Sequence, residues 1–151
     1  MRKIIATLSA VITLLSIVPL VTPATSSLTA SASVASMCDV SASSITDFGQ
    51  LNPGATSSIR TTSVSQPNGN IDGGLTIYGQ DWNFGGSPTM SVGATQWRTG
   101  SDTFASLLIS PGVSVGTLSH TTPTSVDLQV VVPAHQTAAA YTQTITFQVT
   151  C

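Results

Sequence analysis

Hydrophobic and polar residues alternate along most of the chain after residue 22, and this period of two predicts β-strands. No segment beyond residue 22 places apolar residues at the spacing of a helix face. Glycine, proline and asparagine separate the alternating runs and mark turns. We therefore expect seven or eight short strands, at residues 38–45, 57–65, 74–80, 89–96, 103–110, 112–118, 125–132 and 141–150.

Strands at this spacing predict an all-β fold, an antiparallel β-sandwich that is immunoglobulin-like in the broad sense. The run "VDLQVVVP" at 126–133 is the most apolar of them, so we expect it to form a central strand. Pro133 should end that strand, because proline has no N–H to donate to a neighbouring strand.

The first 24 residues have the layout of a secretory signal peptide. Arg2 and Lys3 precede an uncharged apolar run at 4–21, which predicts a signal helix. A retained membrane anchor is the alternative, because about 18 apolar residues is near the minimum for a membrane span. We expect cleavage, near residue 24 or as late as residue 35, and a secreted protein that meets the membrane only through this segment. The folded domain should then be 38–151.

Residues 25–37 are rich in serine and alanine and continue the alternation toward the N-terminus. Leu28, Ala30, Ala32 and Val34 alternate with small polar residues. One interpretation is that this stretch is the tail of the signal peptide and is removed with it. The other is that it remains as an exposed strand that inserts into the sheet of a neighbouring subunit as a donor strand. The sequence leaves both open.

The two cysteines predict one disulfide, Cys38–Cys151, in an exported chain. Each cysteine is in phase with the apolar residues of its expected strand, Cys38 with Val40 and Cys151 with Val149. We therefore expect both sulfur atoms to face the core and to join the first strand to the last.

The composition argues against several functions. After the signal segment only Arg60 and Arg98 oppose six aspartates, and serine and threonine make up 45 of the 151 residues. A surface solvated by hydroxyl groups lacks the clustered cations that nucleic acid requires. Glutamate is absent, and no two aspartates share the apolar setting of a glycosidase pair.

No motif in the sequence predicts catalysis, and we expect a protein that is not an enzyme and carries no cofactor. "GVSVG" at 112–116 matches the G-x-S-x-G motif around Ser114. That motif needs a strand–turn–helix unit, and here it lies between two predicted strands. His120 and His135 lie in separate predicted turns, where a histidine is usually solvated.

A secreted binding module is the competing hypothesis. Surface aromatic rings on a sandwich can stack on sugars, which makes Tyr78, Trp82 and Trp97 candidate ligand-binding residues for a polysaccharide. The alternative for the tryptophans is that they cap the core at strand ends. Three aspartates in predicted loops are weak Ca²⁺ candidates without EF-hand spacing: Asp72, Asp81 and Asp102.

Four segments resemble exported prokaryotic immunoglobulin-like surface proteins: "FGQLNPG" (48–54), "PNGN" (67–70), "LTIYGQDW" (75–82) and the closing "YTQTITFQVTC". The last is similar to the final strand of fimbrial and filament subunits. This resemblance implies a structural role at the cell surface, in a pilus-like filament or matrix, with self-association or binding to other surface proteins and sometimes assembly by donor strands. A disulfide from first strand to last departs from chaperone-assembled pilins.

Overall fold

The computed structural model describes residues 29–44, 47–85 and 87–151. The predicted signal segment therefore lies outside the described residues. Val34–Cys151 form one compact unit. Within its described part the regular structure is β-strand, apart from one 3₁₀ turn, and every strand pair is antiparallel. The all-β prediction is confirmed.

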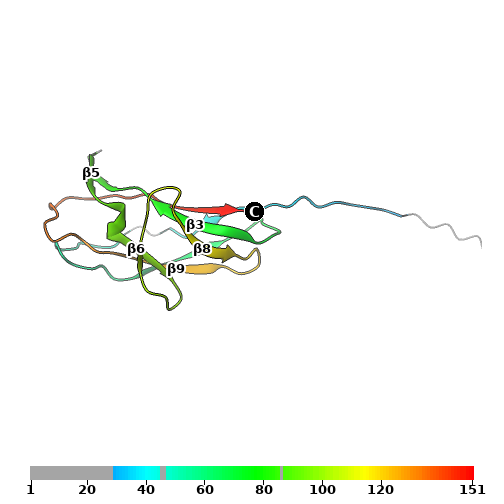
Figure 1. Cartoon of the computed structure of the whole chain (residues 1–151), viewed down its shortest axis with the longest axis horizontal. Helices are drawn as coiled ribbons and strands as arrows, with labels where there is room; N and C mark the ends of the chain where they lie inside the picture. Colours follow the sequence, from blue (N-terminus) through cyan, green and yellow to red (C-terminus); the bar gives the residue numbers. More distant parts are fainter. Residues whose placement is uncertain (1–28, 45–46, 86) are drawn as a thin grey trace, which may run out of the picture. The chain divides into compact units, whose positions relative to one another are not determined.

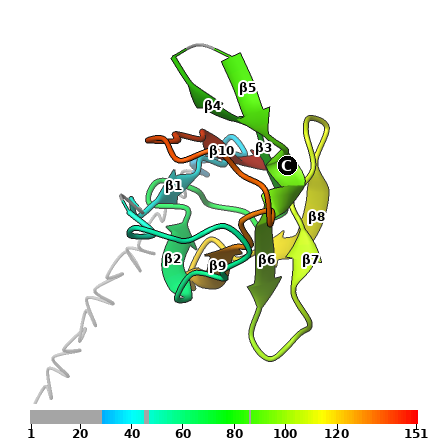
Figure 2. The same ribbon diagram turned by 90° about the vertical axis from the view of Figure 1, so that its left-hand side faces the viewer.

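The larger sheet has five strands, in the order β1-β2-β9-β6-β7 (Figure 2). The predicted central strand is β9, which pairs with β2 on one side and β6 on the other. The members of this sheet are β1 (Ser41–Ala42), β2 (Arg60–Ser65), β9 (Thr124–Val130), β6 (Thr95–Thr99) and β7 (Ala105–Ser106).

The second sheet has three strands, in the order β10-β3-β8, and a two-stranded ribbon, β4-β5, stands beside it (Figure 1). A register shift after Leu75 interrupts the pairing of β3 with β8. The members are β10 (Ile145–Thr150), β3 (Gly73–Gly79), β8 (Val113–Leu118), β4 (Trp82–Phe84) and β5 (Ser87–Met90).

One apolar core joins the two sheets, as expected of a β-sandwich. On β3 the inward residues Leu75 and Ile77 are buried while their neighbours Gly74, Thr76 and Tyr78 are at least partly accessible, because successive strand residues point to opposite faces. β2, β6, β8 and β9 add further members in the same way. The main cluster comprises Val64, Leu75, Ile77, Val92, Trp97, Leu107, Leu118, Val126 and Leu128.

Three strand predictions need correction, and β4 was not predicted. The expected strand at 89–96 is divided between β5, the 3₁₀ turn Val92–Ala94 and β6. Ser91 Oγ accepts a hydrogen bond from the Gly93 N–H, and Asp81 Oδ1 accepts one from the Val92 N–H at 2.7 Å. Because these side-chain oxygens accept backbone N–H groups that would otherwise bond to a neighbouring strand, the strand is interrupted here. The expected strands at 38–45 and 103–110 are reduced to the two-residue strands β1 and β7.

Candidate functional site

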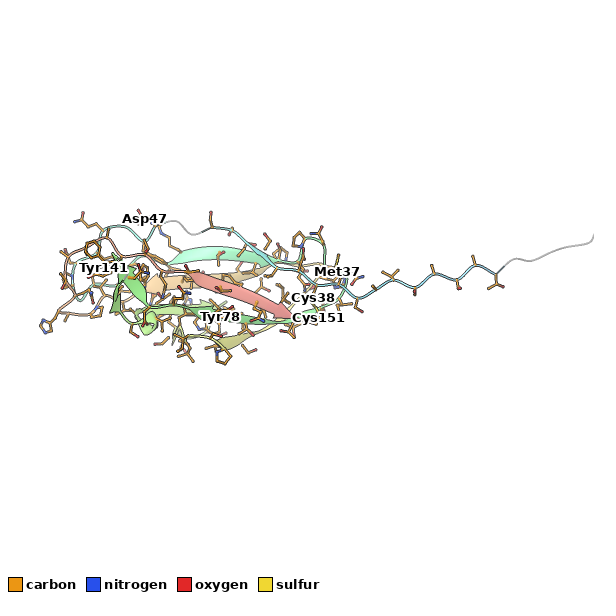
Figure 3. The ribbon with its side chains drawn as sticks, turned by 90° about the horizontal axis from the view of Figure 1, so that it is seen from above. Met37, Cys38, Asp47, Tyr78, Tyr141 and Cys151 are labelled. Atoms are coloured by element: carbon orange, nitrogen blue, oxygen red, sulfur yellow. A yellow bond between two sulfur atoms is a disulfide. The ribbon has the colours of Figure 1, made fainter. Side chains whose placement is uncertain are left out.

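The disulfide Cys38–Cys151 is present, with the two Cα atoms 6.3 Å apart. It ties the segment before β1 to the end of β10. The two cysteines are less buried than the core residues, because Cys38 is half-buried and Cys151 is exposed. The bond lies toward one end of the domain (Figure 3). We call this the disulfide end.

Gly73 makes room for the disulfide at the start of β3. A Cβ atom at Gly73 would lie 2.6 Å from Val149 Cγ2 and 3.0 Å from Cys151 Sγ. A Cβ at Gly74, the next residue, would meet nothing closer than 3.8 Å. Close packing of β3 against the last residues of β10 therefore depends on the missing side chain at Gly73.

The "PNGN" turn holds the chain on both sides of Cys38. Asn70 Nδ2 donates to the Ala35 carbonyl at 2.8 Å, and Asn70 Oδ1 accepts from the Met37 N–H at 2.8 Å. The Asn70 N–H also donates to the Met37 carbonyl at 2.9 Å. Asn68 Nδ2 donates to Asp39 Oδ2 at 2.8 Å. The backbone at residues 35–39 is therefore fixed at the disulfide end.

Residues 29–37 form an exposed segment that we call the arm. All nine side chains are exposed, and no part of the arm is a strand in this structure. Val34 exposes 85% of its surface and Met37 52%. The alternating apolar residues of the arm therefore face water, which is costly unless another surface covers them.

A hollow of about 960 Å³ opens in the sandwich, away from the disulfide end. One wall is made by residues 42–44 and 47–53, the other by residues 136–145 together with Phe147. Its floor contains the apolar residues Trp82, Met90, Leu128, Val130 and Val132. In Figure 3, Asp47 and Tyr141 of the two walls lie toward one end of the domain, and Met37, Cys38 and Cys151 toward the other.

The strand β10 forms one edge of its sheet. It pairs with β3 along Ile145–Thr150, and among the described residues no backbone hydrogen bond joins it to a segment on its other side. Its inward residues Ile145, Phe147 and Val149 are only partly buried, whereas Leu75 and Ile77 on β3 are fully buried. An unpaired row of backbone groups beside incompletely covered apolar side chains is the usual setting for strand addition.

The predicted ligand-binding aromatics do not form a surface platform. Trp82 and Trp97 are both buried, and Trp97 belongs to the main core cluster. Tyr78 is half-buried on β3, on the face opposite Leu75 and Ile77. The structure therefore does not bring the three rings together on one exposed face, although Trp82 contributes to the floor of the hollow.

Trp82 is held by a chain of hydrogen bonds that begins in the core and ends at an exposed position. Its indole Nε1–H donates to Thr95 Oγ1 at 3.0 Å, and Thr95 Oγ1 donates to Gln143 Oε1 at 2.6 Å. Gln143 Nε2 in turn donates to the Gln80 carbonyl at 2.7 Å. Thr95 is completely buried. The network joins β6 and β4 to the segment just before β10, so it supports one wall of the hollow.

The three Ca²⁺ candidates lie in separate interactions. Asp81 accepts the Val92 N–H, Asp102 accepts the Thr99 hydroxyl at 3.1 Å, and Asp72 binds His120. In the described part of the chain no three His, Cys, Asp or Glu side chains gather as a metal site would require.

Two carboxylates have shifted pKa values. The backbone N–H of His120 and then its ring, with Nδ1 2.7 Å from Asp72 Oδ1, hold the pKa of the exposed Asp72 below its ordinary value. The Thr61 hydroxyl, 2.6 Å from Asp127 Oδ1, lowers the pKa of Asp127, and the Arg98 guanidinium at 3.1 Å adds to this. Both contacts favour the ionised carboxylate.

The remaining residues considered from sequence lie apart from one another. Ser114 sits within β8 opposite Thr76 of β3, in a strand pair rather than at a strand–helix turn. His135 is exposed in the loop that follows Pro133. No helix among residues 29–44, 47–85 and 87–151 is long and apolar enough to cross a membrane.

A comparison with protein-family models gives no match, and neither does a comparison with curated protein sequences. The resemblance to surface and filament subunits therefore rests on the sequence segments named above.

Proposed function

We propose that this protein is an exported structural subunit of the cell surface, with an immunoglobulin-like sandwich that self-associates into a filament or matrix through its N-terminal arm. The proposal includes no catalytic step. It requires that the signal peptide is removed near residue 24 and that residues 25–37 remain on the mature protein.

The observation that carries this proposal is the arm itself. Its apolar residues alternate as in a strand with one buried face, yet they are exposed in the single chain. Asn70 and the disulfide fix the base of the arm on the domain, at Ala35–Met37 and Cys38. A segment patterned for burial, and presented by a rigid base, suits contact with another subunit better than an isolated monomer.

The surface chemistry supports a durable extracellular role. The domain carries few charges and many hydroxyl groups, and its one disulfide encloses nearly the whole folded unit. The burial of Trp82 and Trp97 removes the main support for the alternative, a carbohydrate-binding module, and no observation favours a Ca²⁺-binding module.

Two measurements on the exported protein test the proposal. Intact mass, reduced and non-reduced, gives the cleavage site and the state of the two cysteines together. Light scattering then compares Val34→Asp with Ser33→Asp, which adds the same charge to the other side of the arm. We expect the wild type and Ser33→Asp to form polymers and Val34→Asp to remain monomeric. A mature protein that lacks residues 25–37, or a monomeric wild type, would refute the proposal.

A further inference from the structure

The "PNGN" turn contains the one asparagine–glycine pair of the chain, Asn68–Gly69. The backbone nitrogen of the residue after an asparagine can attack the asparagine Cγ, because the two atoms close a five-membered ring. A side chain on that next residue hinders the approach, so glycine makes the reaction easiest. The other asparagines precede proline, isoleucine and phenylalanine, and they are Asn52, Asn70 and Asn83. Asn68 is therefore the asparagine best placed to react.

The structure leaves the attacking nitrogen of this pair free. Asn68 and Gly69 lie between β2 and β3, outside any strand, and Asn68 is exposed. Among the described residues no hydrogen bond is made by the Gly69 N–H. Attack by this nitrogen therefore breaks no backbone hydrogen bond, and water can reach the group that leaves.

A second pair that could close the same ring, Asp72–Gly73, is held by its surroundings. Asp72 Oδ1 accepts the His120 N–H at 2.9 Å and lies 2.7 Å from His120 Nδ1. Gly73 is the first residue of β3 and pairs with Leu118 of β8. Both residues of this pair are engaged, so it serves as an internal comparison for Asn68.

Packing explains why glycine occupies position 69. A Cβ atom at Gly69 would lie 2.5 Å from Gln66 Oε1. Gln66 is buried, and its Nε2 donates to the Leu118 carbonyl at 2.9 Å, so the side chain cannot move aside without losing this bond. The fold therefore keeps a glycine next to Asn68, and with it the reactive pair.

The Asn68 side chain holds the residue that follows the disulfide. Its Nδ2 donates to Asp39 Oδ2 at 2.8 Å, and the Asn68 N–H lies 3.2 Å from each Asp39 carboxylate oxygen. Asp39 is half-buried and directly follows Cys38. A carboxylate in place of the amide would remove the Nδ2 donor and set two negative charges against each other.

We propose that Asn68 is a self-modifying site, which deamidates in the folded protein and thereby releases residues 35–39 from the "PNGN" turn. The Gly69 nitrogen bonds to Asn68 Cγ, and the side-chain nitrogen leaves as ammonia after water carries the Gly69 proton to it. Water then opens the succinimide ring. If it breaks the bond between Cγ and the Gly69 nitrogen, aspartate forms; if it breaks the bond to the backbone carbonyl carbon, isoaspartate forms.

Both products disturb the contacts at the disulfide end. Each places a negative charge opposite Asp39, where the amide now donates a hydrogen bond. Isoaspartate also adds a methylene group to the backbone two residues before Asn70, whose side chain bonds to Ala35 and Met37. Because the ammonia is lost to solvent, the change runs in one direction only.

Peptide mapping of the exported full-length chain tests the modification. The folded protein is aged at mildly alkaline pH and digested with pepsin in acid, which avoids deamidation during digestion, and a urea-unfolded sample is the positive control. We expect Asn68 to deamidate progressively, partly to isoaspartate, while Asn70, Asn83 and Asp72 remain unchanged. Asn68→Gln, which cannot close the five-membered ring, should stay intact. A folded protein that keeps Asn68, or loses Asn70 or Asn83 as fast, would overturn the proposal.

An exchange of the two side chains tests the release. Asn68→Asp mimics the product, and Asn68→Asp with Asp39→Asn puts the amide and the carboxylate back in contact with their places exchanged. In urea unfolding we expect Asn68→Asp to raise the unfolding equilibrium constant about two- to tenfold and the double variant to reverse most of this. The backbone amide NMR signals of Met37 and Asn70 should move in Asn68→Asp and return in the double variant. Unchanged signals and stability in Asn68→Asp would overturn the release.

Discussion

Removal of the disulfide should cost this domain a large share of its stability. The bond joins residues 113 positions apart, and the double substitution Cys38→Ser with Cys151→Ser opens that loop. In the chain-entropy model a loop of this length corresponds to about 4.8 kcal/mol at 25 °C. Cys151 is exposed and Cys38 half-buried, so little packing is lost besides. We expect the free energy of unfolding to fall by about 4–5 kcal/mol, against a typical total of about 5–15 kcal/mol.

Urea unfolding followed by tryptophan fluorescence measures this change, because Trp82 and Trp97 are both buried in the folded state. The dependence of the unfolding free energy on urea should also become steeper, since the opened unfolded chain exposes more surface. Reduction of the wild-type protein is the matched control and should give the same loss. A loss below about 1.5 kcal/mol in both samples would refute the argument from loop length.

Three further changes have definite expected outcomes. Gly73→Ala should lower the free energy of unfolding by about 1–3 kcal/mol through overpacking, and Gly74→Ala by much less; equal losses in urea unfolding would contradict the close approach described above. Thr95→Val should cost about 1–3 kcal/mol by leaving the Trp82 N–H unpaired, with Thr95→Ser as the control that keeps the hydroxyl; a Val variant as stable as the Ser variant would contradict this. The lowered pKa of Asp127 stabilises the fold at pH values above the ordinary aspartate pKa of about 3.9. That contribution is lost as the pH falls through the pKa of Asp127 in the folded state. The thermal unfolding temperature of Asp127→Asn should therefore depend less on pH below about 4 than that of the wild type.

Local sequence pattern was sufficient to predict those parts of the fold that depend on it. β9 lies between two other strands of its sheet. The apolar run at 126–133 predicts this position, because a central strand is the one best able to bury such a run. The disulfide followed from a count of two cysteines and an export signal. The exposure of Cys151 did not follow, because phase along a strand says nothing about where the sheet ends.

The hollow could not be predicted, because it depends on how two distant segments are spaced. Residues 47–53 and 136–142 are irregular loops with no strand pattern, and their separation is set by tertiary contacts such as the bond from Asn83 N–H to the Thr142 carbonyl. The sequence also did not predict that Asn70 holds the backbone at Ala35 and Met37. The "PNGN" turn was recognised as a turn, but its hydrogen bonds reach 33 and 35 residues back along the chain.

The placement of the arm base at the disulfide end and of Tyr141 and Asp47 at the other has a consequence for symmetry (Figure 3). A contact between these two ends uses a different surface on each partner, so it cannot be a two-fold interface. After each copy joins, the assembly would still have one unoccupied disulfide end and one unoccupied end of the other kind. Repetition of such a heterologous contact closes into a ring only if its rotation allows, and otherwise grows without limit as a fibre with distinct ends.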